Sequence, residues 1–150
     1  MLELHDSSLS YISGSSAIPL IGLTVGDLID SVAETFPDHD ALISRHQGIR
    51  YSYRALRDEC NRFAAGLLAL GIQKGDRIGI WSPNHAEWVI AQFATPKIGA
   101  ILVNINPAYR LRELEHALRQ SGCSALIAGP PFKTSNYAAI LRELCPEMDT

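Results

Sequence analysis

Short apolar segments alternate with amphipathic segments over the second half of the chain, and this alternation constrains the fold more than any other feature. The segments at 101–105 and 125–128 are almost continuously hydrophobic, which is typical of strands covered by helices on both faces. The pattern predicts strands at 77–81, 101–105 and 125–128, and helices at 85–95, 111–120 and 136–144. This order predicts the α/β class, with parallel βαβ units joined by right-handed crossovers.

Ahead of these units, the sequence predicts a helix, a small hairpin and a second helix. The first helix is expected over 24–36, with Thr24 as its cap. A β-hairpin over 41–52 follows. Ser52 then caps a helix with a regular apolar stripe, and Gly71 suits the left-handed end of that helix.

Two regions follow from this assignment. Residues 1–23 are rich in serine and are expected to form a flexible N-terminal arm. Residues 24–150 are expected to form one α/β unit, since 150 residues fit one domain or the opening part of a larger one.

The charge of the sequence disfavours some partners and some cellular locations. The net charge is −3 and the basic residues are dispersed, so no nucleic-acid partner is expected. No Lys or Arg precedes Arg45, whereas a mitochondrial presequence needs Arg and a secretory signal needs a basic start. The apolar segment 17–23 is too short to span a bilayer, so no transmembrane segment is expected. These features together predict a cytoplasmic protein.

Motifs that carry chemistry are missing from the sequence. Cys60, Cys123 and Cys145 are odd in number and far apart, so we interpret them as reduced and mostly buried thiols and expect no metal site. Neither the Gly-x-Gly-x-x-Gly fingerprint nor a P-loop occurs. A Rossmann-type oxidoreductase and a self-contained nucleotide-binding domain are therefore disfavoured.

An ordered set of short motifs is more specific than any one of them. The set comprises Tyr51-Ser52-Tyr53-x-x-Leu56, the segments 70–78, 83–88 and 97–109, Glu113-Leu114 and Ser121-Gly122-Cys123. In order and spacing it resembles the N-terminal portion of adenylate-forming ligases. The residues within these motifs are most similar to those of fatty-acyl and medium-chain acyl-CoA synthetases. Residues 24–150 would then be the incomplete N-terminal α/β subdomain of an AMP-binding domain.

The resemblance implies a two-step ligase reaction. A carboxylic or fatty acid and ATP give an acyl-adenylate and pyrophosphate, and the thiol of coenzyme A then displaces AMP. ATP, Mg²⁺ and coenzyme A are implied for the full-length enzyme, with Mg²⁺ and basic groups stabilising the transferring phosphoryl. The family's phosphate loop, adenine segment, ribose-binding Asp and catalytic Lys do not occur in this sequence. We therefore expect no catalytic residue in this chain, no activity from it alone, and self-association through uncovered apolar surface.

One candidate binding residue remains. In related ligases, a basic residue just past the asparagine–proline pair can approach the phosphates of coenzyme A. In this sequence Ala108 follows Pro107 directly, and Arg110, two residues further on, is the candidate for this contact. The other interpretation is a solvated residue at a helix start. A departure from the family is Pro96, which is predicted to kink or end its helix and leaves the placement of Lys97 open. A stand-alone α/β binding or interaction module remains the alternative to a ligase fragment.

Overall fold

The computed structural model describes residues 14, 17–18 and 20–149. Most of the predicted arm lies outside these residues, so the boundary at residue 23 stays a prediction. The elements are α1 (Val25–Thr35), β1 (Asp40–Ser44), β2 (Ile49–Ser52), α2 (Tyr53–Ala69), β3 (Arg77–Trp81), α3 (Ala86–Lys97), β4 (Ile101–Ile105), α4 (Leu111–Ser121), β5 (Ala125–Ala128), α5 (Tyr137–Leu144) and a 3₁₀ turn, η1 (Pro146–Asp149). Each predicted helix and strand is present within a residue or two of its predicted bounds.

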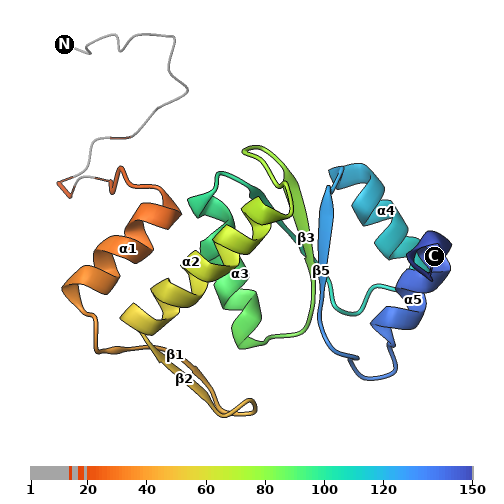
Figure 1. Ribbon diagram of the computed structural model, residues 1–150, viewed down its shortest axis with the longest axis horizontal. Helices are drawn as coiled ribbons and strands as arrows, with labels where there is room; N and C mark the ends of the chain where they lie inside the picture. Colours follow the sequence, from red (N-terminus) through yellow and green to blue (C-terminus); the bar gives the residue numbers. More distant parts are fainter. Residues whose placement is uncertain (1–13, 15–16, 19, 150) are drawn as a thin grey trace, which may run out of the picture.

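The described residues form a parallel three-stranded sheet in the order β4-β3-β5. Helices α2 and α3 cover one face of this sheet, and α4 and α5 cover the other (Figure 1). Layers of this kind bury strands on both faces, which explains why the strand sequences lack polar alternation. The predicted α/β class is confirmed.

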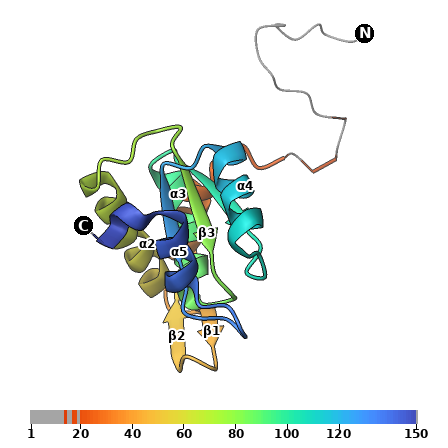
Figure 2. The ribbon, with the colours of Figure 1, turned by 90° about the vertical axis from the view of Figure 1, so that its right-hand side faces the viewer.

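The predicted hairpin is also present, as a separate antiparallel pair of β1 and β2. It projects from the end of the molecule on the α2 side of the sheet (Figures 1 and 2). Its turn contains Gly48 at a positive φ of 68°. The loop at this turn reaches α3, and that contact matters below.

Three clusters of buried apolar side chains hold these layers together in the described part of the chain. One lies among α1, α2 and α3, and a second lies between α2 and the sheet. The third lies between the sheet and α4 with α5. Their buried members are, in the same order, Ile29, Leu56, Cys60, Ala64, Ile90 and Ala94; Leu67, Ile72, Ile78 and Ala100; and Trp81, Ile105, Leu114 and Tyr137.

The helix caps follow the sequence closely. Thr24 accepts a hydrogen bond from the backbone N–H of Asp27 at 3.1 Å, and Ser52 accepts one from Ala55 at 3.3 Å. Gly71 has a φ of +86°, the left-handed conformation predicted for the end of α2. The bonds to Thr24 and Ser52 satisfy backbone N–H donors that the first turn of a helix leaves unpaired.

Helix α3 ends one residue after Pro96, which is one of the two outcomes predicted from the sequence. Helix α3 continues through Pro96 to Lys97, although proline cannot donate the usual bond to the preceding turn. The hydroxyl of Thr95, the residue before Pro96, donates to the carbonyl of Ala91 one turn earlier at 3.0 Å. Lys97 is thereby placed against α1, where its ammonium pairs with Asp30.

Candidate functional site at the carboxyl edge of the sheet

The loops that follow β3, β4 and β5 meet at one edge of the sheet because the strands are parallel. These edge loops span residues 82–85, 106–110 and 129–136. Ligands of open α/β sheets bind at this carboxyl edge. It is therefore the first place to look for a site.

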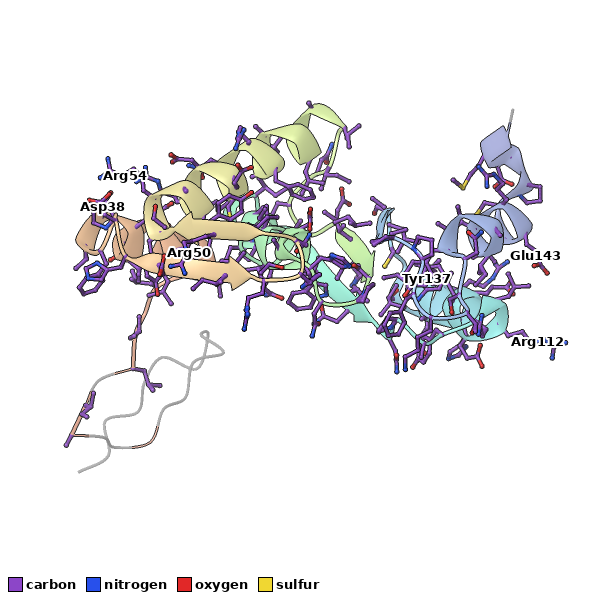
Figure 3. All side chains as sticks on the ribbon, turned by 90° about the horizontal axis from the view of Figure 1, so that it is seen from below. Asp38, Arg50, Arg54, Arg112, Tyr137 and Glu143 are labelled. Atoms are coloured by element: carbon purple, nitrogen blue, oxygen red, sulfur yellow. The ribbon has the colours of Figure 1, made fainter. Side chains whose placement is uncertain are left out.

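Two buried aromatic residues support the loop after β4. The side chains of Trp81 and Tyr137 are 0% and 1% exposed, and their rings stack at 3.8 Å with an interplanar angle of 29°. The indole N–H of Trp81 donates to the Asn106 carbonyl at 3.1 Å, and the Tyr137 hydroxyl donates to the Pro107 carbonyl at 2.8 Å. Burial raises the pKa of the Tyr137 phenol, which therefore remains a donor. Figure 3 shows Tyr137 in the layer between the sheet and α4.

The loop also has internal turn bonds. The Asn106 side chain accepts from the backbone N–H of Ala108 at 2.9 Å, an Asx-turn arrangement. The Asn106 carbonyl accepts from the N–H of Tyr109 at 3.0 Å. The turn delivers the chain to Arg110, which is the cap residue of α4, and the Glu113 carboxylate accepts the Arg110 backbone N–H at 3.1 Å.

Arg110, the residue singled out from the sequence, lies exposed at this edge. Its guanidinium donates to the Thr134 hydroxyl at 2.6 Å and to the Thr134 carbonyl at 3.3 Å. These two bonds connect the loop after β4 to the loop after β5. An Arg side chain has five N–H donors, so donors remain to meet a ligand.

Two further cations are Lys133, in the loop after β5, and Arg112, in the first turn of α4. Lys133 has a positive φ of 52°, and its ammonium lies 5.2 Å from the centre of the Phe132 ring. Arg112 points outward from α4 (Figure 3). The edge therefore presents positive charge that is dispersed rather than gathered into one pocket.

The loops after β3 and β5 approach each other closely at Gly129. Its backbone N–H donates to the Trp81 carbonyl at 3.0 Å. A Cβ added at Gly129 would lie 2.3 Å from the Ser82 hydroxyl oxygen, so only glycine fits here without movement. The sequence does not mark this role, because a glycine before two prolines is also an ordinary end of a strand.

A second polar cluster lies where the hairpin turn meets the start of α3. The Gln47 side-chain oxygen accepts from the Ala86 backbone N–H at 2.8 Å, and its amide donates to Glu87 at 2.8 Å. The rings of His46 and His85 pack edge to face at 5.1 Å. The bond from Gln47 is the largest cause that lowers the pKa of the Glu87 carboxyl. Beside this cluster is a mostly apolar hollow of about 450 Å³, bordered by Ser82, Trp88 and Gly129.

These groups offer hydrogen bonds and positive charge to a ligand. No group of three or more His, Cys, Asp or Glu residues in the described part of the chain could hold a metal ion. Among those residues, every fully buried polar side-chain atom has a hydrogen-bond partner. The edge offers the positive charge of Arg110 and the backbone of the loops.

The fold defines a parallel α/β domain, a class in which ligands meet the carboxyl ends of the strands. The chain belongs to the AMP-binding enzyme family, whose sequence model matches residues 29–150. This match confirms the resemblance to acyl-CoA synthetases of the adenylate-forming superfamily.

Related sequences agree on the branch of the family. The chain is 45% identical over 141 residues to mouse "Medium-chain acyl-CoA ligase ACSF2, mitochondrial", covering 94% of this chain and 23% of that protein. It is 41% identical over 129 residues to "Putative acyl-CoA synthetase YngI" of Bacillus subtilis, covering 86% of this chain and 24% of that protein. The chain thus spans about a quarter of the length of the curated relatives that it matches.

Solved structures agree on the fold. The N-terminal domain of FACL13 from Mycobacterium tuberculosis superposes with a TM-score of 0.74 at 28% identity, covering 80% of this chain and 29% of that one. A fatty acyl CoA synthetase from the same organism gives 0.70 at 28% identity, covering 84% and 23%. Similarity at this level indicates that the solved structures share the parallel sheet and its flanking helices.

The prediction of a cytoplasmic protein is wrong. The mouse, rat and bovine relatives, at 44–45% identity, all carry the word mitochondrial in their names. The prediction took the lack of Lys and Arg before Arg45 as the lack of a presequence, but the charge of these residues does not establish a compartment. Among the described residues, no helix is long and apolar enough to cross a bilayer.

Proposed function

We propose that this chain forms the N-terminal part of an ATP-dependent acyl-CoA synthetase acting on medium-chain or longer fatty acids. The carboxylate of the acid attacks the α-phosphate of ATP, and pyrophosphate leaves. The thiol of coenzyme A then attacks the acyl-adenylate carbonyl, and AMP leaves. The observation that carries the proposal is the 45% identity, over 94% of the chain, to a protein named a medium-chain acyl-CoA ligase.

The residues present do not fit a magnesium–triphosphate site. The described chain has no cluster of carboxylates for Mg²⁺, and the sequence has no glycine-rich phosphate loop. We therefore assign binding of ATP and Mg²⁺ to other parts of the full-length enzyme and derive no step from them. That nucleic acid is not a partner stays a prediction from the charge distribution.

Coenzyme A is the substrate for which this chain offers a contact. Arg110 lies exposed at the carboxyl edge, and its bonds to Thr134 hold the guanidinium in one place. Phosphate oxygens accept charge-assisted bonds from such a group. We propose that Arg110 contacts a phosphate of coenzyme A in the full-length enzyme.

The first experiment tests where activity resides. The 150-residue chain is expected to show no ATP–pyrophosphate exchange with fatty acids, because it lacks the phosphate loop and the catalytic lysine. A full-length enzyme carrying this sequence should show exchange and should form an acyl-CoA. Exchange by the short chain would contradict the assignment, and a full-length enzyme without exchange on any fatty acid would refute the function.

The second experiment tests Arg110. In the full-length enzyme, Arg110→Ala should raise the KM for coenzyme A by roughly tenfold, the effect of losing one charge-assisted hydrogen bond, and leave exchange unchanged. The matched control is Arg119→Ala, which removes an exposed arginine at the other end of α4, where it pairs with Glu115. An unchanged KM in Arg110→Ala would reject the contact and favour a solvated helix-start residue.

A further inference from the structure

We propose that Trp81 and Tyr137 are positioning residues that hold the loop 106–110 in place and so set the position of Arg110. The proposal rests on the function proposed above for Arg110. Neither aromatic side chain reaches the surface, since they are 0% and 1% exposed. Both would therefore act through the backbone of the loop and not through contact with a ligand.

Two sets of hydrogen bonds hold the loop 106–110: bonds within the loop, and bonds from side chains elsewhere in the fold. Bonds from Ala108 and Tyr109 to Asn106 close the turn within itself and do not attach it to the rest of the fold. The donors of Trp81 and Tyr137 meet two successive carbonyls, those of Asn106 and Pro107. These two bonds attach the turn to the core between the sheet and α4 with α5.

Trp81 and Tyr137 fix each other's position, because their rings are stacked. The stacked rings fix both donors, and the stack lies in the core between the sheet and α4 with α5. Tyr137 opens α5 directly after the loop 129–136, whose Thr134 binds the Arg110 guanidinium. A shift of α5 would therefore move both the loop carbonyl and the partner of Arg110.

The hydroxyl of Tyr137 can be tested apart from its ring. Phenylalanine would fill the same space and keep the stack on Trp81, so packing survives the exchange. Only the bond to the Pro107 carbonyl is lost, and that carbonyl is left without its partner. Tyr51→Phe is the matched control, because Tyr51 is a half-buried tyrosine of the hairpin that packs in a different cluster.

The experiment uses the full-length enzyme with Tyr137→Phe, Tyr51→Phe and Arg110→Ala. We expect Tyr137→Phe to raise the KM for coenzyme A about fivefold, the effect of losing one hydrogen bond of ordinary strength. ATP–pyrophosphate exchange should stay unchanged, since that half-reaction does not use coenzyme A. Arg110→Ala combined with Tyr137→Phe should be no worse than Arg110→Ala alone, because both act through one group.

A second measurement does not depend on activity. Hydrogen–deuterium exchange of the segment 106–110 should become several times faster in Tyr137→Phe than in the parent or in Tyr51→Phe. Trp81→Phe should give the same local acceleration. Unchanged exchange in Tyr137→Phe would overturn the positioning role, whatever the kinetics. Faster exchange with an unchanged coenzyme A KM in Tyr137→Phe would overturn the link to Arg110; if Arg110→Ala also left that KM unchanged, the proposed contact itself would fail.

Discussion

Cys60 has the most perturbed environment of any thiol in the chain. Its side chain is 0% exposed in the cluster among α1, α2 and α3. Burial raises the pKa of the thiol to about 11, and the nearby ammonium of Lys97 opposes that shift. The prediction of a buried, reduced thiol is confirmed for Cys60, while Cys123 and Cys145 are half-buried.

This pKa shift predicts a loss of stability at alkaline pH. The ordinary thiol pKa of 9.0 applies to the unfolded chain, so between pH 9 and about pH 11 the unfolded state loses its proton first. Stability from Cys60 is therefore full below pH 9 and falls as the pH rises to 11. The free energy of unfolding should drop by about 2–3 kcal/mol over this window, since the shift is about two pKa units and each unit corresponds to about 1.4 kcal/mol.

The measurement is denaturant unfolding at a series of pH values, followed by tryptophan fluorescence in dilute solution. Lysines and tyrosines also titrate in this range, so the control is Cys60→Ala, which lacks only this thiol. The difference in pH slope between the two proteins isolates Cys60. Parallel slopes would show that burial does not shift this group.

At the scale of elements, α3 obtains its cap from a distant segment. His85, the residue in the cap position, makes no side-chain capping bond. Gln47 in the hairpin turn accepts the Ala86 N–H instead and also binds Glu87. The hairpin is thereby joined to the start of the helix that packs against α1 and α2.

Removing this cap should destabilise the fold. Gln47→Ala is expected to lower the free energy of unfolding by about 1–2 kcal/mol, because it leaves the first N–H of α3 unpaired. It should also raise the pKa of Glu87 toward its ordinary value, since the bond from Gln47 is the largest cause that lowers it. Urea unfolding gives the first quantity, and carboxyl NMR titration gives the second.

Gln73→Ala is the control for Gln47→Ala, because it truncates an exposed glutamine in the turn before β3. Gln73→Ala should change neither the free energy of unfolding nor the pKa of Glu87. Equal losses in the two variants would show that the effect is not one of capping.

At the scale of the whole molecule, apolar surface and strand edges remain uncovered. In the part of the chain that the structure describes, β4 and β5 each pair only with β3. Large exposed apolar side chains cluster near the start of α1: Leu20, Ile21, Leu23, Val25 and Leu28. Open strand edges and contiguous apolar surface favour association.

The 150-residue chain is therefore expected to self-associate. Light scattering after size exclusion should show a mass that rises with protein concentration. A sharp monomer peak with cooperative melting would contradict this and favour the stand-alone binding module over the ligase fragment.

What the sequence determined by itself is local. Hydrophobic periodicity, caps such as Thr24 and Ser52, and the left-handed Gly71 depend on neighbours within a turn or two, so they place helices and strands and indicate the α/β class. The ordered motifs identify the family for the same reason, since their spacing can be counted along the chain. The compartment was predicted wrongly, because the composition of these residues does not establish where the protein is delivered.

Tertiary structure alone decided the sheet order and the site. The stack of Trp81 on Tyr137, the cap that Gln47 provides for α3 and the bonds from Arg110 to Thr134 join segments 24 to 56 residues apart. Nothing local in the sequence marks such partners, because each residue type has an ordinary explanation where it stands. They become partners only when parallel strands bring their carboxyl ends to one edge and when the hairpin folds against α3.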